Sequence, residues 1–365
     1  MASCQAKAEQ QSDGDGELRR EIGQMLMVGF RGTEVSDTSQ IIRDIEEYNI
    51  GGVILFEYDA ASRSRPRNIA SREQLRDLCK RLQERAKYGL LIGIDQEGGR
   101  VTRLKESYGF PRFASAKKSA EGGDDSVRHY AALTAEVLES MGINLNFAPC
   151  VDVNVNPQCP IIGKLGRSYG EDADKVAHYA KIWINEHRNR GIISCPKHFP
   201  GHGSSKSDTH KGLADVSDTW QEWELEPYRQ LIAEGEAEMI MTTHVFNAKL
   251  DSRYPATLSQ ATLTGLLRDS LKYSGVIITD DMAMGAMTQQ YEYAEMVRLA
   301  IVAGADMLCL SNNGESYNPD IVKETIELIY KMVKDGEIPA ERIHQSSKRV
   351  KALKERYQVV GKVRQ

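Results

Sequence analysis

The sequence has 365 residues, of which 41% are hydrophobic and 27% are charged. A chain this long and this apolar can bury a large core, which excludes an intrinsically disordered tail or a disulfide-stapled miniprotein. Lys and Arg together number 47 against 52 Asp and Glu, for a formal net charge of −5, and no cationic tract stands out. This balance disfavours a nucleic-acid partner, and without a run of about 18 apolar residues the sequence predicts no membrane-spanning segment.

The chain starts with a polar stretch, and we expect residues 1–15 to form a flexible leader. No signal peptide precedes it in this sequence, which favours the cytoplasm. The alternative is a periplasmic or lipoprotein-anchored protein whose leader has been removed, because Cys4 follows small residues and precedes a polar spacer. The six cysteines are scattered without a C-x-x-C pair, so we expect reduced thiols and no zinc knuckle.

Short apolar runs then alternate with longer amphipathic stretches. Strands are expected at 27–30, 52–56, 90–94, 145–151, 192–195, 239–243, 275–279 and 306–311. Helices are expected at 73–87, 126–141, 172–190, 219–233, 260–272, 292–303 and 320–334, and the basic stretch 348–364 is typical of a solvated amphipathic helix. This alternation favours a (β/α)8 TIM-type barrel over a doubly wound open sheet. We expect one catalytic domain over 16–357 and a short tail over 358–365.

Polar residues follow at least five of these strands. The segments concerned are 95–100, 152–154, 197–198, 243–244 and 280–281. In α/β barrels the carboxyl ends of the strands converge on one rim, and that rim holds the active site. Any single Asp there could equally be a helix cap, but five converging clusters predict a site at this rim.

A loop rich in Gly and Ser follows the strand at 192–195 and ends in Asp208-Thr209-His210. Side chains two residues apart share a face in extended backbone, so the carboxylate can fix the tautomer of the imidazole and stabilise its cation. Such a pair is a competent proton shuttle near neutral pH. A loop hydrogen bond without chemistry is the alternative.

The strand at 275–279 ends in Asp280-Asp281. Adjacent residues of a strand point to opposite faces, so only one carboxylate can face the barrel mouth. That carboxylate could act as a nucleophile or stabilise an oxocarbenium-like centre. The other could cap or brace the next helix.

Taken together, these segments resemble glycoside hydrolase family 3, and specifically its single-domain bacterial β-N-acetylglucosaminidases, also called β-N-acetylhexosaminidases. The matching motifs are KHFPGHG at 197–203, DTH at 208–210, EIGQMLMVGFRG at 21–32, GIDQEGGRVTRL at 93–104, NFAPCVDVN at 146–154, GRSYG at 166–170, PATLS at 255–259 and TDDMAMGA at 279–286. They occur in family order over nearly the whole chain. The segment 155–164 departs from the family pattern, and the placement of Arg167 depends on it.

The resemblance implies a role for each matching residue. Asp280 would be the nucleophile, and His210 the general acid/base tuned by Asp208. The terminal sugar would be bound by five residues, namely Asp95, Arg103, Arg167, Lys197 and His198. Asp95 could instead brace Arg100 or Arg103, and Lys197 and His198 could merely anchor the loop.

The implied activity is that of a retaining exo-β-N-acetylglucosaminidase that needs no cofactor and no metal. It would remove terminal β-linked N-acetylglucosamine by double displacement. Peptidoglycan or chitin-type fragments are the expected donors, although a glycoprotein glycan stays open, as do phosphorolysis and the oligomeric state. Two rival functions are a metal-dependent hydrolase, suggested by four histidines near strand ends, and a catalytically dead sugar-binding protein. The four histidines are His198, His202, His210 and His244.

Overall fold

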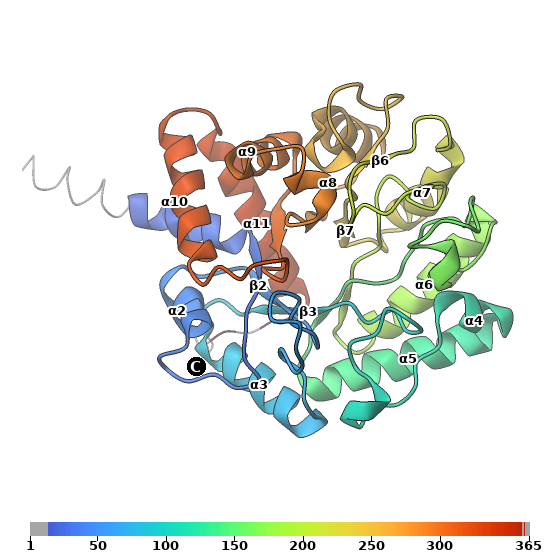
Figure 1. Cartoon of the computed structure of the whole chain (residues 1–365), viewed down its shortest axis with the longest axis horizontal. Helices are drawn as coiled ribbons and strands as arrows, with labels where there is room; N and C mark the ends of the chain where they lie inside the picture. The colour runs from blue at the N-terminus through green and yellow to red at the C-terminus, as the bar shows by residue number, and fades with distance from the viewer. Residues whose placement is uncertain (1–13, 360, 362–365) are drawn as a thin grey trace, which may run out of the picture.

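The computed structural model describes residues 14–359 and 361, and its main feature is an eight-stranded parallel sheet. The strand order is β5-β4-β3-β2-β1-β10-β9-β7, and helices surround the strands (Figure 1). The predicted (β/α)8 barrel is confirmed. Cys4, residues 1–13 of the predicted leader, and residues 360 and 362–365 of the predicted tail lie outside the described residues.

The strands are short, and each one falls within or overlaps a range expected from the sequence. They are β1 (Leu26–Gly29), β2 (Gly52–Leu55), β3 (Leu91–Ile94), β4 (Leu145–Asn146), β5 (Ile193–Ser194), β7 (Met239–Met241), β9 (Val276–Asp281) and β10 (Met307–Leu310). A small parallel ladder joins β6 (Ala214–Asp215) to β8 (Val245–Phe246). In β2, Ile54 joins the apolar cluster inside the barrel, while Val53 and Leu55 join the larger cluster beneath the helices. Alternate residues thus point to the two faces of the sheet, and the strands are apolar on both faces because both faces are buried.

The barrel closes through the segment that follows β5. Phe199 N–H donates to Met241 O at 2.9 Å, and Thr243 N–H donates to Phe199 O at 2.9 Å. On the other side of the segment, Val151 N–H donates to Lys197 O at 2.8 Å. Residues 196–199, hereafter the seam, thus join the β4 side of the barrel to the β7 side.

The helices have the following bounds. They are α2 (Gln40–Glu47), α3 (Arg72–Arg85), α4 (Ala116–Glu121), α5 (Gly123–Met141), α6 (Ala173–Arg188), α7 (Glu226–Ala233), α8 (Gly285–Thr288), α9 (Tyr293–Ala303), α10 (Ile321–Lys334) and α11 (Ala340–Arg356). Residues 14–24 are also helical. Single turns of 3₁₀ helix are η1 (Glu106–Tyr108), η2 (Gly163–Leu165), η3 (Glu222–Leu225) and η4 (Ala256–Leu258), and η5 (Ala261–Ser270) is π-helical. None of the helices in the described part of the chain is long and apolar enough to cross a bilayer.

Two helical segments differ from expectation. The range 219–233 contains the 3₁₀ turn η3 followed by α7, whose first turn holds Pro227. Proline lacks a backbone N–H and suits a helix start, so it separates the two pieces. The range 260–272 forms η5, whose wider π-helical spacing an apolar pattern of ordinary helical period does not distinguish.

The expectation of a solvated C-terminal helix was wrong. Helix α11 buries Val350 and Leu353, which join the apolar cluster inside the barrel. The Lys354 ammonium nitrogen is buried as well, and it donates to Gln24 Oε1 at 2.9 Å and to Gly89 O at 3.0 Å. Since these acceptors precede β1 and β3, α11 covers the amino-terminal end of the barrel. The basic composition of the helix concealed this buried stripe.

Candidate active site

A cavity of about 300 Å³ opens at the carboxyl-terminal rim of the barrel. Seven of the eight sequence-predicted site residues line it, namely Asp95, Arg103, Arg167, Lys197, His198, His210 and Asp280. The eighth, Asp208, is hydrogen-bonded to His210. Segments separated by almost 200 residues in the chain therefore meet around one hollow, as the rim of an α/β barrel allows.

The alternation of side chains along β9 gives the two carboxylates at its end different surroundings. Val276 and Ile278 belong to the cluster inside the barrel, whereas Ile277 belongs to the outer cluster. Asp280 continues the inner series, and both Asp280 and Asp281 line the cavity. Asp281 is held by Ser311, whose Oγ donates to its Oδ2 at 2.5 Å and whose backbone N–H donates to its Oδ1 at 3.0 Å.

Asp280 is partly buried, and its surroundings favour the ionised carboxylate. Its Oδ1 accepts the Asp281 backbone N–H at 2.8 Å. Burial alone would raise the pKa of Asp280, but the nearby imidazoles of His244, His198 and His210 outweigh it and lower that pKa below its ordinary value. An ionised carboxylate with a free oxygen is the form that a nucleophile requires.

Asp208 and His210 form the expected pair on residues 203–212, which we call the Asp-His loop. Asp208 Oδ1 accepts from His210 Nδ1 at 2.8 Å and from its backbone N–H at 2.9 Å. Burial would raise the pKa of Asp208, and these bonds lower it below the ordinary value. The His210 side chain is 65% exposed and that of Asp208 20%. The pairing leaves Nε2 of His210 as the nitrogen that can exchange a proton with a bound molecule.

The Asp-His loop is docked on α8. Ala286 N–H donates to Thr209 O at 3.0 Å, and Gln289 Nε2 donates to Lys211 O at 3.3 Å. A Cβ on Gly285 would lie 2.7 Å from the carbonyl oxygen of His210, so only glycine permits this approach without movement. Helix α8 thus sets the position of the imidazole relative to the cavity.

The opposite wall of the cavity is a network of buried ion pairs. Lys197 Nζ lies 2.7 Å from Asp95 Oδ1 and 2.7 Å from Glu97 Oε1. Glu97 also binds Arg167 through two parallel bonds of 2.7 and 2.8 Å. Burial would raise the pKa of Glu97, but Arg167 and Lys197 hold it well below its ordinary value. The charges are therefore fixed in place, as a preorganised binding site for polar groups requires.

Arg103 adds a donor to this wall. Its Nη2 contacts Asp95 at 3.4 Å, so the sequence-based alternative that Asp95 braces Arg103 describes a real contact. Within the described residues, the buried Nε of Arg103 has no hydrogen-bond partner. This N–H, in a side chain that lines the cavity, can be satisfied by a ligand.

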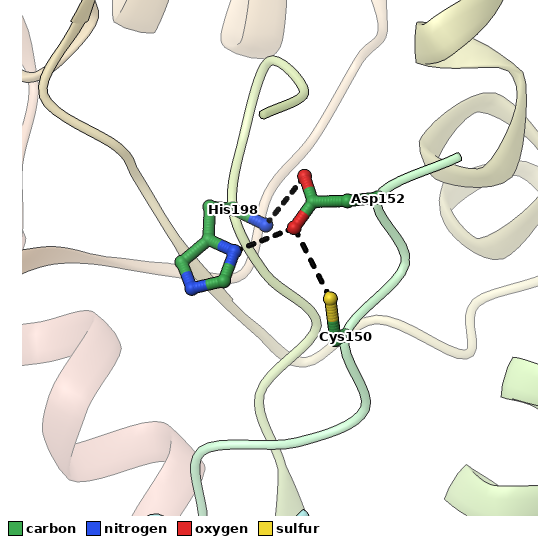
Figure 2. Close-up of side chains that lie close together, drawn as sticks. All are labelled: Cys150, Asp152 and His198. Atoms are coloured by element: carbon green, nitrogen blue, oxygen red, sulfur yellow. Dashed lines mark hydrogen bonds and ion pairs between the residues drawn. The ribbon is translucent and has the colours of Figure 1, made fainter. Parts of the chain in front are cut away.

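A second cluster behind the cavity consists of Cys150, Asp152 and His198 (Figure 2). Their potential metal-binding atoms all lie within 4.8 Å of one another. Asp152 Oδ2 accepts from His198 Nδ1 at 2.6 Å and from the Cys150 thiol at 3.1 Å. Donor faces acceptor in both contacts, so the three groups satisfy one another as a hydrogen-bonded unit.

The other histidines of the metal-hydrolase hypothesis are held separately. His202 Nε2 lies 3.3 Å from Thr209 Oγ1, and His210 is bonded to Asp208. His244 donates from Nε2 to Asp281 O at 2.9 Å. Because each ring has a partner of its own, the arrangement gives no support to a shared ligand set.

Sequence reasoning did not assign roles to Glu97 and Asp152, although both stand in the strand-end clusters it identified. The signal was their position after β3 and β4, next to residues that were assigned. The departing segment 155–164 proves compatible with Arg167, because the carbonyl oxygens of Ile161 and Ile162 accept from its Nη1 and its backbone N–H at 2.9 and 3.1 Å.

Comparisons with known proteins agree with this geometry. Residues 17–353 match the family model described as the glycosyl hydrolase family 3 N terminal domain. The chain is 33% identical to a β-hexosaminidase of Actinobacillus pleuropneumoniae over 299 residues, which cover 80% of this chain and 82% of that relative.

Solved structures give the same result. A family 3 β-N-acetylglucosaminidase of Paenibacillus sp. str. FPU-7 has 36% sequence identity and a TM-score of 0.83, with coverage of 94% of this chain and 63% of the Paenibacillus chain. A β-N-acetylhexosaminidase of Beutenbergia cavernae has 26% identity and a TM-score of 0.81, with coverage of 93% and 98%.

Proposed function

Because this chain belongs to glycosyl hydrolase family 3, we propose that it is a retaining exo-β-N-acetylglucosaminidase that removes terminal β-linked N-acetylglucosamine. Its broader activity is that of a glycoside hydrolase of the β-hexosaminidase type. One observation carries the finer proposal: an ionised Asp280 and the imidazole of His210 line the same cavity.

The reaction proceeds in two displacements. A carboxylate oxygen of Asp280 bonds to the anomeric carbon while the bond from that carbon to the leaving oxygen breaks, and the imidazolium of His210 gives its proton to that oxygen. A water molecule then bonds to the anomeric carbon, the bond to Asp280 breaks, and His210 takes up the proton of the water. Two inversions give overall retention, and both groups return to their starting forms.

Asp208 supports both steps. Its hydrogen bond to Nδ1 of His210 stabilises the cation that donates the proton and fixes the tautomer that later accepts one. The exposure of the His210 side chain, at 65%, leaves its ring accessible to a leaving group at the cavity mouth.

The size and lining of the cavity support exo action on one sugar unit. About 300 Å³ lies at the lower end of the roughly 300–1,000 Å³ typical of ligand pockets. The fixed ion pairs of Asp95, Glu97 and Lys197, of which Asp95 and Lys197 line the cavity, suit the hydroxyl groups of a terminal sugar. We propose short peptidoglycan or chitin-type fragments as donors, because their non-reducing end can enter while the remainder stays outside.

Hydrolysis of paired chromogenic β-N-acetylglucosaminide and β-glucoside substrates tests this proposal. We expect the wild type to prefer the N-acetyl substrate and Asp280→Asn to lose activity by about 10⁴-fold, since it removes the nucleophile. Asp269→Asn, which changes an exposed carboxylate on η5, is the matched control and should match the wild type. Equal activity of the wild type and Asp280→Asn would refute the mechanism.

Product analysis by ¹H NMR gives a second test. Retention requires the β-anomer of free N-acetylglucosamine to appear first, before mutarotation. Initial release of the α-anomer would refute the double displacement. Formation of a sugar 1-phosphate in phosphate buffer would instead identify a phosphorolytic enzyme.

A further inference from the structure

We propose that Asp152 is a positioning residue that acts through His198 to hold the Arg167 guanidinium against the sugar cavity. The proposal rests on the proposed function for the identity of the sugar. Asp152 itself does not line the cavity, whereas His198 and Arg167 both do. Its effect on a ligand must therefore pass through another side chain.

The Asp152 carboxylate is buried and surrounded by donors. Its Oδ1 accepts from the backbone N–H of His202 at 2.7 Å and that of His198 at 3.4 Å. Its Oδ2 accepts from His198 Nδ1 at 2.6 Å and from the Cys150 thiol at 3.1 Å. Figure 2 shows the carboxylate between the ring and the thiol, with the second ring nitrogen directed away from it. Burial would raise the pKa of Asp152, but His198 lowers it below its ordinary value, so the group is an acceptor only.

Two contacts determine the tautomer of His198. Because Asp152 can only accept, the proton of this contact lies on Nδ1 of the ring. The second nitrogen, Nε2, lies 3.1 Å from Arg167 Nη2, and a guanidinium can only donate. Nε2 must therefore carry the lone pair. The ring therefore carries a proton on Nδ1, and a proton on Nε2 would face the donor of Arg167.

This lone pair completes the positioning of Arg167. Four of its five N–H groups have partners: two bind Glu97, one binds Ile161 O and one binds His198 Nε2. The remaining N–H is on Nη1, in a side chain that lines the cavity. Glu97 fixes one edge of the guanidinium, and the ring of His198 fixes its rotation from the other side. A sugar oxygen would then meet a donor whose direction is already set.

The contacts from Asp152 through His198 to Arg167, hereafter the relay, are tested by the variant Asp152→Asn. This substitution preserves the shape of the side chain but adds a hydrogen-bond donor. The amide oxygen is expected to keep the His202 N–H, which is the shorter backbone contact. The amide NH₂ then faces His198 Nδ1, so the ring must move its proton to Nε2, where it opposes Arg167. We expect kcat/KM for the N-acetylglucosaminide to fall about 10- to 100-fold, chiefly through KM, since an oriented donor acts on bound substrate and transition state alike.

Histidine-selective ¹⁵N NMR reads the tautomer directly and requires no activity. The His198 resonances are those missing from His198→Gln. In the wild type we expect a protonated Nδ1 and an unprotonated Nε2, and the reverse in Asp152→Asn. The opposite tautomer in the wild type would overturn the proposal even if Asp152→Asn did not fold. Unchanged ring protonation in a folded Asp152→Asn would also overturn it.

A double-mutant cycle separates the relay from a merely structural role of Asp152. If Asp152 acts through His198, adding Asp152→Asn to His198→Gln should raise KM no further, whereas additive effects would overturn the proposal. The matched control is Asp124→Asn, which alters a surface Asp-His pair with His178 at 2.9 Å and should leave KM unchanged. Titration with N-acetylglucosamine gives the same comparison as binding. An absence of turnover in the wild type would count against the proposed function. The tautomer of His198, measured by ¹⁵N NMR, would still test the relay.

Discussion

The sharpest residue-scale distinction in the site is between two adjacent aspartates. Asp280 lines the cavity and has a lowered pKa. Burial raises the pKa of Asp281, whose oxygens are occupied by Ser311. The difference arises because strand alternation gives the two side chains different neighbours, so that Ser311 binds Asp281 and not Asp280. The sequence predicted that only one could face the mouth, which was wrong because both line the cavity, and the two bonds from Ser311 to Asp281 are what distinguish them.

The role of His210 predicts a dependence on the leaving group. For His210→Ala we expect kcat/KM to fall about 10²- to 10⁴-fold with a poor aryl leaving group, because proton donation is lost. With a dinitrophenyl leaving group, which departs without a proton, the loss of the first step should nearly vanish. Steady-state rates with both substrates measure this difference. Equal losses with the two leaving groups would contradict the assignment of His210 as the acid.

At the scale of elements, the docking of the Asp-His loop on α8 makes a glycine important for catalysis. Gly285→Ala places a Cβ where only 2.7 Å separates it from His210 O, so the loop must shift. A displacement of about 1 Å near the reacting groups can cost up to about 10²-fold in rate. We expect kcat to fall about 10- to 100-fold with a poor leaving group and much less with dinitrophenol.

The neighbouring variant Gln290→Ala, at an exposed position past α8, serves as the control for Gly285→Ala and should behave as the wild type. If Gly285→Ala slows both substrates equally, the loop contact affects something other than proton donation. Stopped-flow measurement of the first turnover separates that outcome from slow product release.

The strands of the barrel were largely predictable, because strands buried on both faces produce short apolar runs. Helix α2 was missed because it has only eight residues, although Ser39 stands at its N-cap. The buried stripe of α11 was missed because lysines and arginines dominate its composition. The π-helical geometry of η5 has no distinct periodicity in sequence.

The candidate site was predictable in its members and not in its connections. Strand-end position and the family motifs identified Asp95, Lys197 and Asp280. Whether Glu97 would bind Arg167, or Asp152 would bind His198, depends on distances across the barrel that no spacing along the chain contains.

At the scale of the whole molecule, a buried ion-pair network lies at the amino-terminal end of the barrel, opposite the rim that holds the cavity. Asp306, just before β10, is fully buried and receives Arg342 at 2.8 Å, Arg349 at 3.0 Å and also Arg268. Ile277 N–H donates to it as well, at 2.9 Å. This anchor joins η5, β9 and α11 far from the carboxyl-terminal rim.

Asp306→Asn should therefore destabilise the fold without changing the chemistry. Removing one partner of a buried ionic network typically costs about 3–5 kcal/mol, because the remaining charges stay buried without compensation. Urea unfolding followed by circular dichroism measures the loss, with exposed Asp335→Asn as control. The folded fraction should keep the KM of the wild type, and a changed KM would contradict the separation of the two ends.

Lys354 predicts how stability varies with pH. Burial lowers its pKa to about 7, and its two acceptors, Gln24 and Gly89, match the two N–H groups of a neutral amine. Above pH 7 the unfolded chain binds a proton that the folded chain does not, so this group adds stability as pH rises towards 10 and none below 7. Relative to Lys354→Met, the free energy of unfolding should gain about 2–3 kcal/mol between pH 7 and 9. A difference that stays constant in urea titrations over this range would contradict the prediction.

The seam at residues 196–199 carries Lys197 and His198, so the stretch that completes the circle of strands also reaches the cavity. Under the proposed function we therefore expect sugar binding and barrel closure to be coupled: a sugar bound by these two side chains would stabilise the seam, and opening of the seam would release the sugar. By mass action, sugar binding favours the closed seam, and the closed seam favours sugar binding. We expect the barrel to be most stable when sugar saturates the cavity, and to open first at the seam when the cavity is empty.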